Sequence, residues 1–237
     1  MKYMGSKNRI AKEILPIMLK ERGQRTWVEP FVGGGNMIDK VQGKRIGADL
    51  NEYVIALLNE MSKPTFVAPT ISEEKYNELK SNKDLYEKWV VGYAGTQLSF
   101  GATWFGSYRR DNLGKRNYCL EAQTNVNKQS KNLQGVEFIY SSYDSLEVPE
   151  NSFIYCDPPY LGTNDNYETS FTEQDSEDLF NLLMQSKCKF ALSEFDHPFI
   201  LEQAQKNGLN TLIIGERQNL KNRRTEILIT NYEQQPT

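Results

Sequence analysis

The sequence has few of the residues that hold metals or covalent cross-links. Its 237 residues include three cysteines and one histidine. The cysteines, Cys119, Cys156 and Cys188, lie far apart and form no Cys-x-x-Cys pair. A structural zinc site needs a set of closely spaced Cys or His ligands, and a disulfide framework needs an even number of cysteines. The sequence therefore predicts a protein of a reducing compartment, with no metal site and no disulfide framework.

Long hydrophobic runs are also missing. The chain is 38% hydrophobic and 25% charged. No apolar stretch approaches the roughly 20 residues of a membrane span. The short apolar stretch from Ile14 to Leu19 is broken by Pro16 and does not fit a secretory signal. The sequence predicts a soluble protein of one domain, or of one domain with a large insertion.

Positive charge is not in excess, because the formal net charge is −3. Taken alone, this disfavours a nucleic-acid partner, since neutralising phosphates drives such binding. However, bases dominate residues 105–133 and recur near 217–224, whereas acids concentrate at 173–178. A local basic face is therefore expected. The candidate phosphate-binding residues are Arg109, Arg110, Lys115, Arg116, Lys221 and Arg223. For any one of the first four, a solvated charged turn is an equal alternative.

The order of apolar segments predicts an α/β fold. A helix at 10–20, strands at 26–29 and 45–48 and a helix at 51–61 begin a doubly wound sheet. Residues 62–134 are instead helical and polar, with a β-hairpin or a loop expected at 104–118. We therefore predict one α/β domain, residues 1–61 and 135–237, with a mainly helical insert at 62–134. The later strands are expected at 136–140, 152–156, 190–192, 209–214 and 226–230, and the later helices at 172–186 and 198–207.

The most informative motif is the tetrapeptide Asp157-Pro158-Pro159-Tyr160, which directly follows a short apolar run typical of a buried parallel strand. The Asp157 carboxylate and a proline carbonyl can accept both protons of an exocyclic amine, and Tyr160 offers a face for stacking. The prolines have no backbone N–H to compete for these acceptors. The motif therefore predicts transfer of a group to the amine nitrogen of a planar ring.

A second motif, Glu29-Pro30-Phe31-Val32-Gly33-Gly34-Gly35, predicts a glycine turn between a strand and a helix. Glycine permits positive φ and a close approach of a ligand to the backbone, although a flexible loop is the simpler alternative. The motif is neither a G-x-G-x-x-G fingerprint nor a P-loop, so an uncharged nucleoside fits better than a diphosphate. Asp49 ends the next strand and can accept two ribose hydroxyls, or simply favour the following helix dipole.

In their order along the chain, these motifs resemble the DNA adenine N6-methyltransferases of the Dam type, which use S-adenosylmethionine. The sequence matches Lys-Tyr-x-Gly-Ser-Lys at residues 2–7, the glycine motif, the strand-end Asp49 and Asp-Pro-Pro-Tyr. It also has the tail Arg-Thr-Glu-Ile-Leu-Ile-Thr-Asn-Tyr at residues 224–232. The resemblance implies a doubly wound, Rossmann-like methyltransferase sheet with an inserted domain that recognises the DNA target.

The resemblance also implies a role for each matching residue. Tyr3 and Lys7 would hold the methionine end of the cofactor, and Asp49 would bind its ribose. Tyr143 would lie near the cofactor adenine. The implied catalytic residues are Asp157, Pro158 and Tyr160. The implied cofactor-binding residues are Tyr3, Lys7, Glu29, Phe31, Gly33, Gly35, Asp49, Tyr143 and Asp157.

The implied reaction is methyl transfer to N6 of a flipped-out adenine in double-stranded DNA, without a metal. A compact, stand-alone enzyme in the cytoplasm of a bacterium or phage-infected cell is expected. The same motifs leave open methyl transfer to cytosine N4, to adenine in RNA or to a glutamine amide, although aspartate before Pro-Pro-Tyr favours adenine. A DNA-binding protein with an inactive site is a further alternative. A nucleotide-binding oxidoreductase would leave the Asp157–Tyr160 motif unexplained.

Overall fold

The structure is a computed structural model that describes residues 1–111, 113–161, 171–218 and 223–233. Its strands form one sheet with the order β3-β2-β1-β4-β5-β7-β6. Strand β4 is parallel to β1 and to β5, β2 is parallel to β3, and β7 is antiparallel to β5 and β6. The strands are β1 (Trp27–Glu29), β2 (Arg45–Asp49), β3 (Val136–Tyr140), β4 (Phe153–Cys156), β5 (Lys189–Phe195), β6 (Asn210–Gln218) and β7 (Arg223–Thr230). The predicted α/β fold class is confirmed.

The helices also follow the predicted order. They are α1 (Ala11–Arg22), α2 (Glu52–Met61), α3 (Glu73–Ser81), α4 (Lys88–Gln97), α5 (Tyr118–Leu133), α6 (Glu173–Gln185) and α7 (Pro198–Lys206). Short 3-10 helices are η1 (Lys7–Arg9), η2 (Ile38–Lys40), η3 (Lys83–Leu85) and η4 (Phe100–Ala102). Two predicted N-termini are confirmed. Asn51 accepts a hydrogen bond from the Val54 N–H at 3.1 Å, and Thr172 and Asp175 form a capping box.

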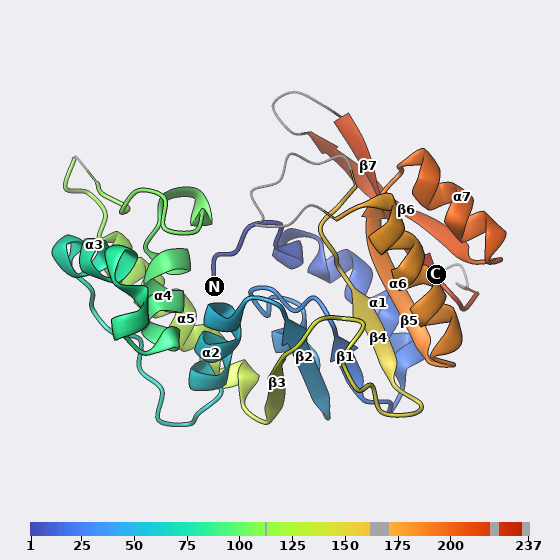
Figure 1. Ribbon diagram of the computed structural model, residues 1–237, viewed down its shortest axis with the longest axis horizontal. Coiled ribbons are helices and arrows are strands. Elements are labelled where there is room, and N and C mark those ends of the chain that lie inside the picture. The colour runs from blue at the N-terminus through green and yellow to red at the C-terminus, as the bar shows by residue number, and fades with distance from the viewer. Residues whose placement is uncertain (112, 162–170, 219–222, 234–237) are drawn as a thin grey trace. The chain divides into compact units, whose positions relative to one another are not determined.

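The chain packs as two compact units (Figure 1). Unit 1 comprises residues 1–8 and 32–141, and unit 2 comprises residues 9–31 and 142–237. In unit 1, α2 packs with α4 and α5 of the predicted insert, and β2 and β3 pack with α2. The domain boundaries at 61 and 135 stay a prediction. The assignment of 62–134 to target recognition stays a prediction.

Unit 1 is built around the contact between α2 and α4. Leu57 and Leu58 of α2 are fully buried. Gly92 of α4 lies against the backbone of α2, so closely that a Cβ there would overlap the carbonyl oxygen of Tyr53. One turn later, a Cβ at Gly95 would lie 2.6 Å from the ring of Trp104. Glycine at these two positions therefore sets how closely α2 and the aromatic segment approach α4.

The β-hairpin expected at 104–118 is not formed by the described residues of that segment. A single antiparallel bridge joins Ser99 to Tyr108 instead. The reason is aromatic packing, because Tyr76 of α3 contacts the rings of both Phe105 and Tyr108 at 5.3 Å between centroids. The side chain of Asp111 then accepts the backbone N–H groups of Leu113 and Arg116, which closes a loop before α5.

In unit 2, both faces of the central strand β4 are covered by apolar side chains. Ile154 and Cys156 of β4 belong to the apolar core that α6 and α7 cover (Figure 1). Successive strand residues point to opposite faces, and Phe153 accordingly stacks on Trp27 with centroids 5.2 Å apart. Both faces of β4 are therefore covered, as is typical of a parallel strand in the middle of a sheet.

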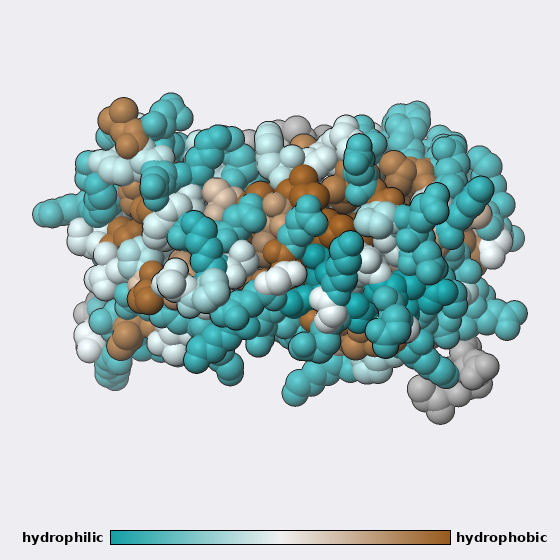
Figure 2. All heavy atoms as spheres, turned by 90° about the horizontal axis from the view of Figure 1, so that it is seen from below, coloured by the Kyte–Doolittle hydropathy of each residue, from teal (hydrophilic) through white to brown (hydrophobic). Residues whose placement is uncertain are grey.

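The face shown in Figure 2 is predominantly hydrophilic, with hydrophobic side chains interspersed among charged ones. Among the described residues, no helix combines the length and the apolar composition that crossing a bilayer would demand.

Gly92 provides a test of the packing in unit 1. A helix interior normally favours alanine over glycine by about 1 kcal/mol. We expect Gly92→Ala to lower the free energy of unfolding by about 1–3 kcal/mol, because its methyl group would overpack against Tyr53. Urea unfolding measures this change. Gly215→Ala is the matched control, because open space surrounds that position. Equal stability of the two variants would contradict the proposed close contact.

Candidate active site

The glycine turn of unit 1 lies directly on the end of β2. The Val32 N–H donates to the Ala48 carbonyl at 2.8 Å, and the Gly35 N–H donates to the Val32 carbonyl at 2.9 Å. Gly33 and Gly35 have φ values of +47° and +64°. These values lie in the left-handed region that glycine adopts readily. The predicted need for glycine in this turn is confirmed at both positions.

Asp49 holds the turn in place. One carboxylate oxygen accepts the Gly33 N–H at 2.9 Å, and the other accepts the Asn51 N–H at 2.9 Å. Burial raises the pKa of the Asp49 carboxyl, and the backbone N–H donors partly offset this. A carboxylate has about four lone-pair positions. Asp49 therefore orders the turn and still has acceptor capacity on both oxygens.

Tyr3 packs on the same glycine turn. A Cβ at Gly33 would lie 2.8 Å from a ring carbon of Tyr3, and one at Gly34 would lie 2.6 Å from the Tyr3 Cβ. In this structure, the close approach that the glycines permit is thus made by Tyr3. Lys7, the other predicted residue of this segment, is buried in η1.

Gln129 of α5 is a residue of this region that sequence reasoning missed. Its Nε2 donates to the carbonyls of Gly34 and Gly35 at 3.0 and 3.1 Å. The signal was present, because Gln129 is a polar residue on the helical stripe formed by Ala122, Val126 and Leu133. A buried amide at an apolar position indicates that the side chain satisfies backbone groups of another segment.

Unit 2 contributes an aromatic cluster. Phe31 stacks on Tyr143 with centroids 5.3 Å apart, and Phe171 contacts the edge of Phe31 at 6.0 Å. Burial, followed by nearby acids including Asp175, raises the pKa of Tyr143 to about 12. The Tyr143 hydroxyl is therefore protonated at neutral pH, and it donates to the Asp175 carbonyl at 3.4 Å. Glu29, at the end of β1, is buried and accepts the Trp27 indole N–H at 2.7 Å.

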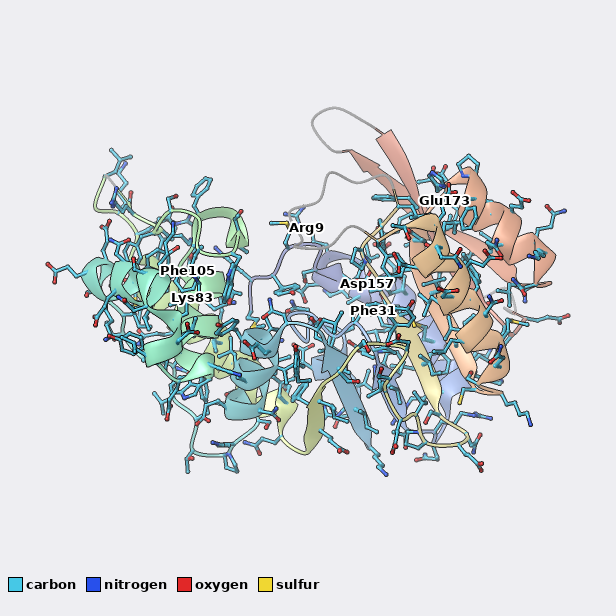
Figure 3. The ribbon with its side chains drawn as sticks, in the orientation of Figure 1. Arg9, Phe31, Lys83, Phe105, Asp157 and Glu173 are labelled. Carbon is cyan, nitrogen blue, oxygen red and sulfur yellow. The ribbon has the colours of Figure 1, made fainter. Side chains whose placement is uncertain are left out.

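The Asp157–Leu161 loop follows β4, the strand of unit 2 that lies between β1 and β5 in the sheet. Figure 3 labels Asp157 and Phe31, which come after the carboxyl ends of the paired strands β4 and β1. Asp157 and Tyr160 are half-buried, and Pro158 is buried. The edge of the parallel strands thus presents an acid and an aromatic ring, as the sequence predicted.

Two buried acids support this loop, and sequence reasoning did not assign either of them a role. The Tyr160 hydroxyl donates to Glu226 Oε1 of β7 at 3.3 Å. The Leu161 N–H donates to Glu194 Oε1 of β5 at 2.9 Å. Burial, followed by neighbouring carboxylates, raises the pKa of Tyr160 well above its ordinary value. A signal was present in both cases, since Glu194 lies within a largely apolar strand and Glu226 directly precedes the apolar run Ile227-Leu228-Ile229.

The predicted DNA-binding residues of unit 1 differ in exposure. The side chain of Arg109 is only 9% exposed, lies 3.0 Å from Glu121 and stacks on the ring of Tyr118. The side chains of Arg110 and Arg116 are each 64% exposed, and they are paired with Glu73 and Glu121. Lys115 is exposed. Lys221 lies outside the described residues, and Arg223 begins β7 with a side chain that is not described.

The structure has a Rossmann-like methyltransferase fold. Its sheet has an antiparallel β7 between β5 and β6, a glycine turn follows β1, and an acid ends β2. More specifically, the chain belongs to the D12 class N6 adenine-specific DNA methyltransferase family, whose sequence profile matches residues 3–93 and 101–227. The family resemblance predicted from the motifs is confirmed.

Similar proteins include M.FokI, a Type II methyltransferase of Planomicrobium okeanokoites, at 24% identity over 97% of this chain and 42% of that protein. M.MjaIII, a Type II methyltransferase of Methanocaldococcus jannaschii, is 27% identical over 75% of this chain and 74% of its own length. The modification methylase StsI of Streptococcus sanguinis is 24% identical over 98% of this chain and 42% of that protein. The chain thus spans about two-fifths of the length of M.FokI and StsI.

The bond from Gly33 to Asp49 gives a test that requires no ligand. We expect Asp49→Ala to speed hydrogen exchange at the Gly33 amide by about 10-fold or more, because the half-buried Gly33 N–H loses its acceptor, at a cost of about 1–3 kcal/mol. Asp49→Asn, which keeps one acceptor oxygen, is expected to lie between the alanine variant and wild type. Amide exchange followed by NMR measures both. An unchanged Gly33 exchange rate would show that the carboxylate does not hold the turn.

Proposed function

We propose that this chain transfers the methyl group of S-adenosylmethionine to N6 of an adenine in double-stranded DNA. The observation that carries the proposal is the Asp157–Tyr160 loop at the carboxyl end of the buried strand β4, in a chain of the N6 adenine-specific family. Open α/β sheets bind ligands at the carboxyl ends of their parallel strands, and the acid and the aromatic ring of this loop lie there.

The residues of unit 1 are suited to the ribose of the cofactor. Both oxygens of Asp49 accept one backbone N–H and have capacity for a hydroxyl donor each. The positive φ of Gly33 and Gly35 turns the backbone without side chains at those positions. We propose that Asp49 holds the ribose hydroxyls, and that Tyr3 and Lys7 contribute to the methionine end.

In unit 2, the stack of Phe31 on Tyr143 supports a role for these rings next to the cofactor adenine, since aromatic faces favour offset stacking with a planar base. We propose that Glu29 meets the α-amino group of the cofactor. When bound, the cofactor supplies a methyl group already activated on a positively charged sulfur. The protein therefore contributes mainly the position and the electron density of the acceptor nitrogen.

The loop after β4 can both position the acceptor nitrogen and increase its electron density. The Asp157 carboxylate and the Pro158 carbonyl are proposed to accept the two N6 protons of the target adenine. These hydrogen bonds favour an amine whose lone pair is less conjugated with the ring and better able to attack. An adenine inside a duplex is out of reach, so the base must be flipped out. Stacking on Tyr160 would return about 1–3 kcal/mol of the unstacking cost.

A decisive assay combines methyl-labelled S-adenosylmethionine with unmethylated double-stranded DNA and identifies the modified nucleoside by mass. We expect N6-methyldeoxyadenosine from the wild type and at least about 100-fold less from Asp157→Ala, because the alanine variant has no acceptor for the N6 proton. Glu202→Ala, which removes an exposed acid on α7, is the matched control and is expected to retain activity. N4-methylcytosine as the product would change the proposed base, and full activity of Asp157→Ala would refute the catalytic role.

Lys115 tests the basic segment as a phosphate-binding surface. We expect Lys115→Ala to reduce the slope of log K against log salt for DNA binding by about 0.9, the contribution of one neutralised phosphate. Lys206→Ala is the matched control, since Lys206 lies on α7 and pairs with Glu177. Fluorescence anisotropy with a DNA duplex at several salt concentrations measures both slopes. The same slope for Lys115→Ala and wild type would exclude Lys115 from the phosphate contacts.

A further inference from the structure

Two consecutive residues after the Asp-Pro-Pro segment are anchored by carboxylates from two different strands. Glu226 of β7 accepts the Tyr160 hydroxyl at 3.3 Å, and Glu194 of β5 accepts the Leu161 N–H at 2.9 Å. Both acids are 1% exposed. Burying a carboxylate is costly unless hydrogen-bond donors surround it. Their burial therefore indicates a specific requirement at this loop.

The two acids act from opposite faces of the sheet. In the antiparallel pair of β5 and β7, Glu194 lies opposite Ile227, and Phe195 lies opposite Glu226. Successive residues alternate between faces, so Glu194 shares the face of Ile227, which belongs to the core beneath α6 and α7. Leu161 is buried in the same core. Glu226 shares the other face with Phe195.

Phe195 completes the support of Tyr160 on that second face. Its ring meets the Tyr160 ring edge-on, with centroids 4.6 Å apart and an interplanar angle of 77°. One hydrogen bond at the hydroxyl and one ring contact limit how the Tyr160 side chain can turn. Burial raises the pKa of this phenol, so the hydroxyl remains a donor at neutral pH.

The backbone of the loop is held at Leu161. Pro158 and Pro159 have no N–H groups, so they cannot donate hydrogen bonds to the sheet. The first backbone donor after Tyr160 is the N–H of Leu161, and Glu194 accepts it. The second oxygen of Glu194 accepts the Phe195 N–H at 2.6 Å. The Glu194 carboxylate thus connects the loop to β5, the strand that also carries Phe195.

We propose that Glu226 and Glu194 are positioning residues of methyl transfer. Glu226 fixes the Tyr160 ring as a preformed stacking surface for the target base, and Glu194 fixes the backbone that carries this ring. The proposal rests on the proposed function, because it assigns Tyr160 to the target base. A ring already held in its working orientation avoids the entropic cost of ordering a mobile side chain on binding.

The test is a double-mutant cycle between Glu226 and Tyr160. We expect Glu226→Gln to lower kcat/KM for DNA by about 10-fold in the wild-type background, since it replaces a charged acceptor of the Tyr160 hydroxyl by a weaker, neutral one. In the Tyr160→Phe background, which keeps the ring and removes the hydroxyl, Glu226→Gln is expected to change kcat/KM by less than about 2-fold. The same loss in both backgrounds would overturn the proposal.

A second readout requires no activity. In protein labelled with 3-fluorotyrosine, the fluorine resonance of Tyr160 is identified by its loss in Tyr160→Phe. We expect it to shift in Glu226→Gln and to stay in place in Ser193→Ala. The latter is the matched control, because it removes a different buried hydrogen bond, the one of 3.0 Å between Ser193 of β5 and Tyr155 of β4. An unmoved Tyr160 resonance in Glu226→Gln would overturn the proposal.

Three further outcomes separate this proposal from the proposed function and test Glu194. If the wild type methylates no DNA, the proposed function fails, whereas the fluorine resonance still decides whether Glu226 positions Tyr160. If thermal melting shows that Glu226→Gln does not fold, Glu226→Asp takes its place, because it keeps the charge and withdraws the carboxylate. For Glu194, Glu194→Ala is expected to speed hydrogen exchange of the Leu161 amide by about 10-fold or more. An unchanged exchange rate would remove Glu194 from the proposal.

Discussion

The parallel pairing of β4 with both β1 and β5 is the constraint on which the candidate site of unit 2 depends. Parallel strands are covered on both faces, and every residue of β4 is buried. Because a buried strand cannot shift its register without exposing apolar side chains, the position of Asp157 beyond its carboxyl end is fixed. The acid is therefore placed by the core of the sheet and the flanking strands.

Carboxylates support the backbone of a loop in each of the two units. Asp49 accepts the N–H groups of Gly33 and Asn51, and Glu194 accepts those of Leu161 and Phe195. A carboxylate binds several donors at once and shapes a turn that has no helix or strand bonds of its own. In unit 1 as in unit 2, the acid thus orders the loop before any ligand is considered.

Local patterns were sufficient to predict most elements and the main motifs. The capping residues Asn51 and Thr172 and the strand before Asp157 depend on neighbours within a few residues, so the sequence determines them directly. The hairpin at 104–118 failed for the opposite reason. Its outcome depends on contacts with Tyr76 and Gly95, which are distant in sequence, and turn residues alone do not reveal such contacts.

The residues that sequence reasoning missed share one property. Gln129, Glu194 and Glu226 are buried polar residues. Each forms a hydrogen bond with a loop outside its own helix or strand. Their partners are distant in sequence, by 33 residues for Leu161 and 66 for Tyr160. A buried polar group without a partner is costly. A buried acid or amide therefore indicates a distant loop that must be held, as Glu194 and Glu226 hold the loop after β4.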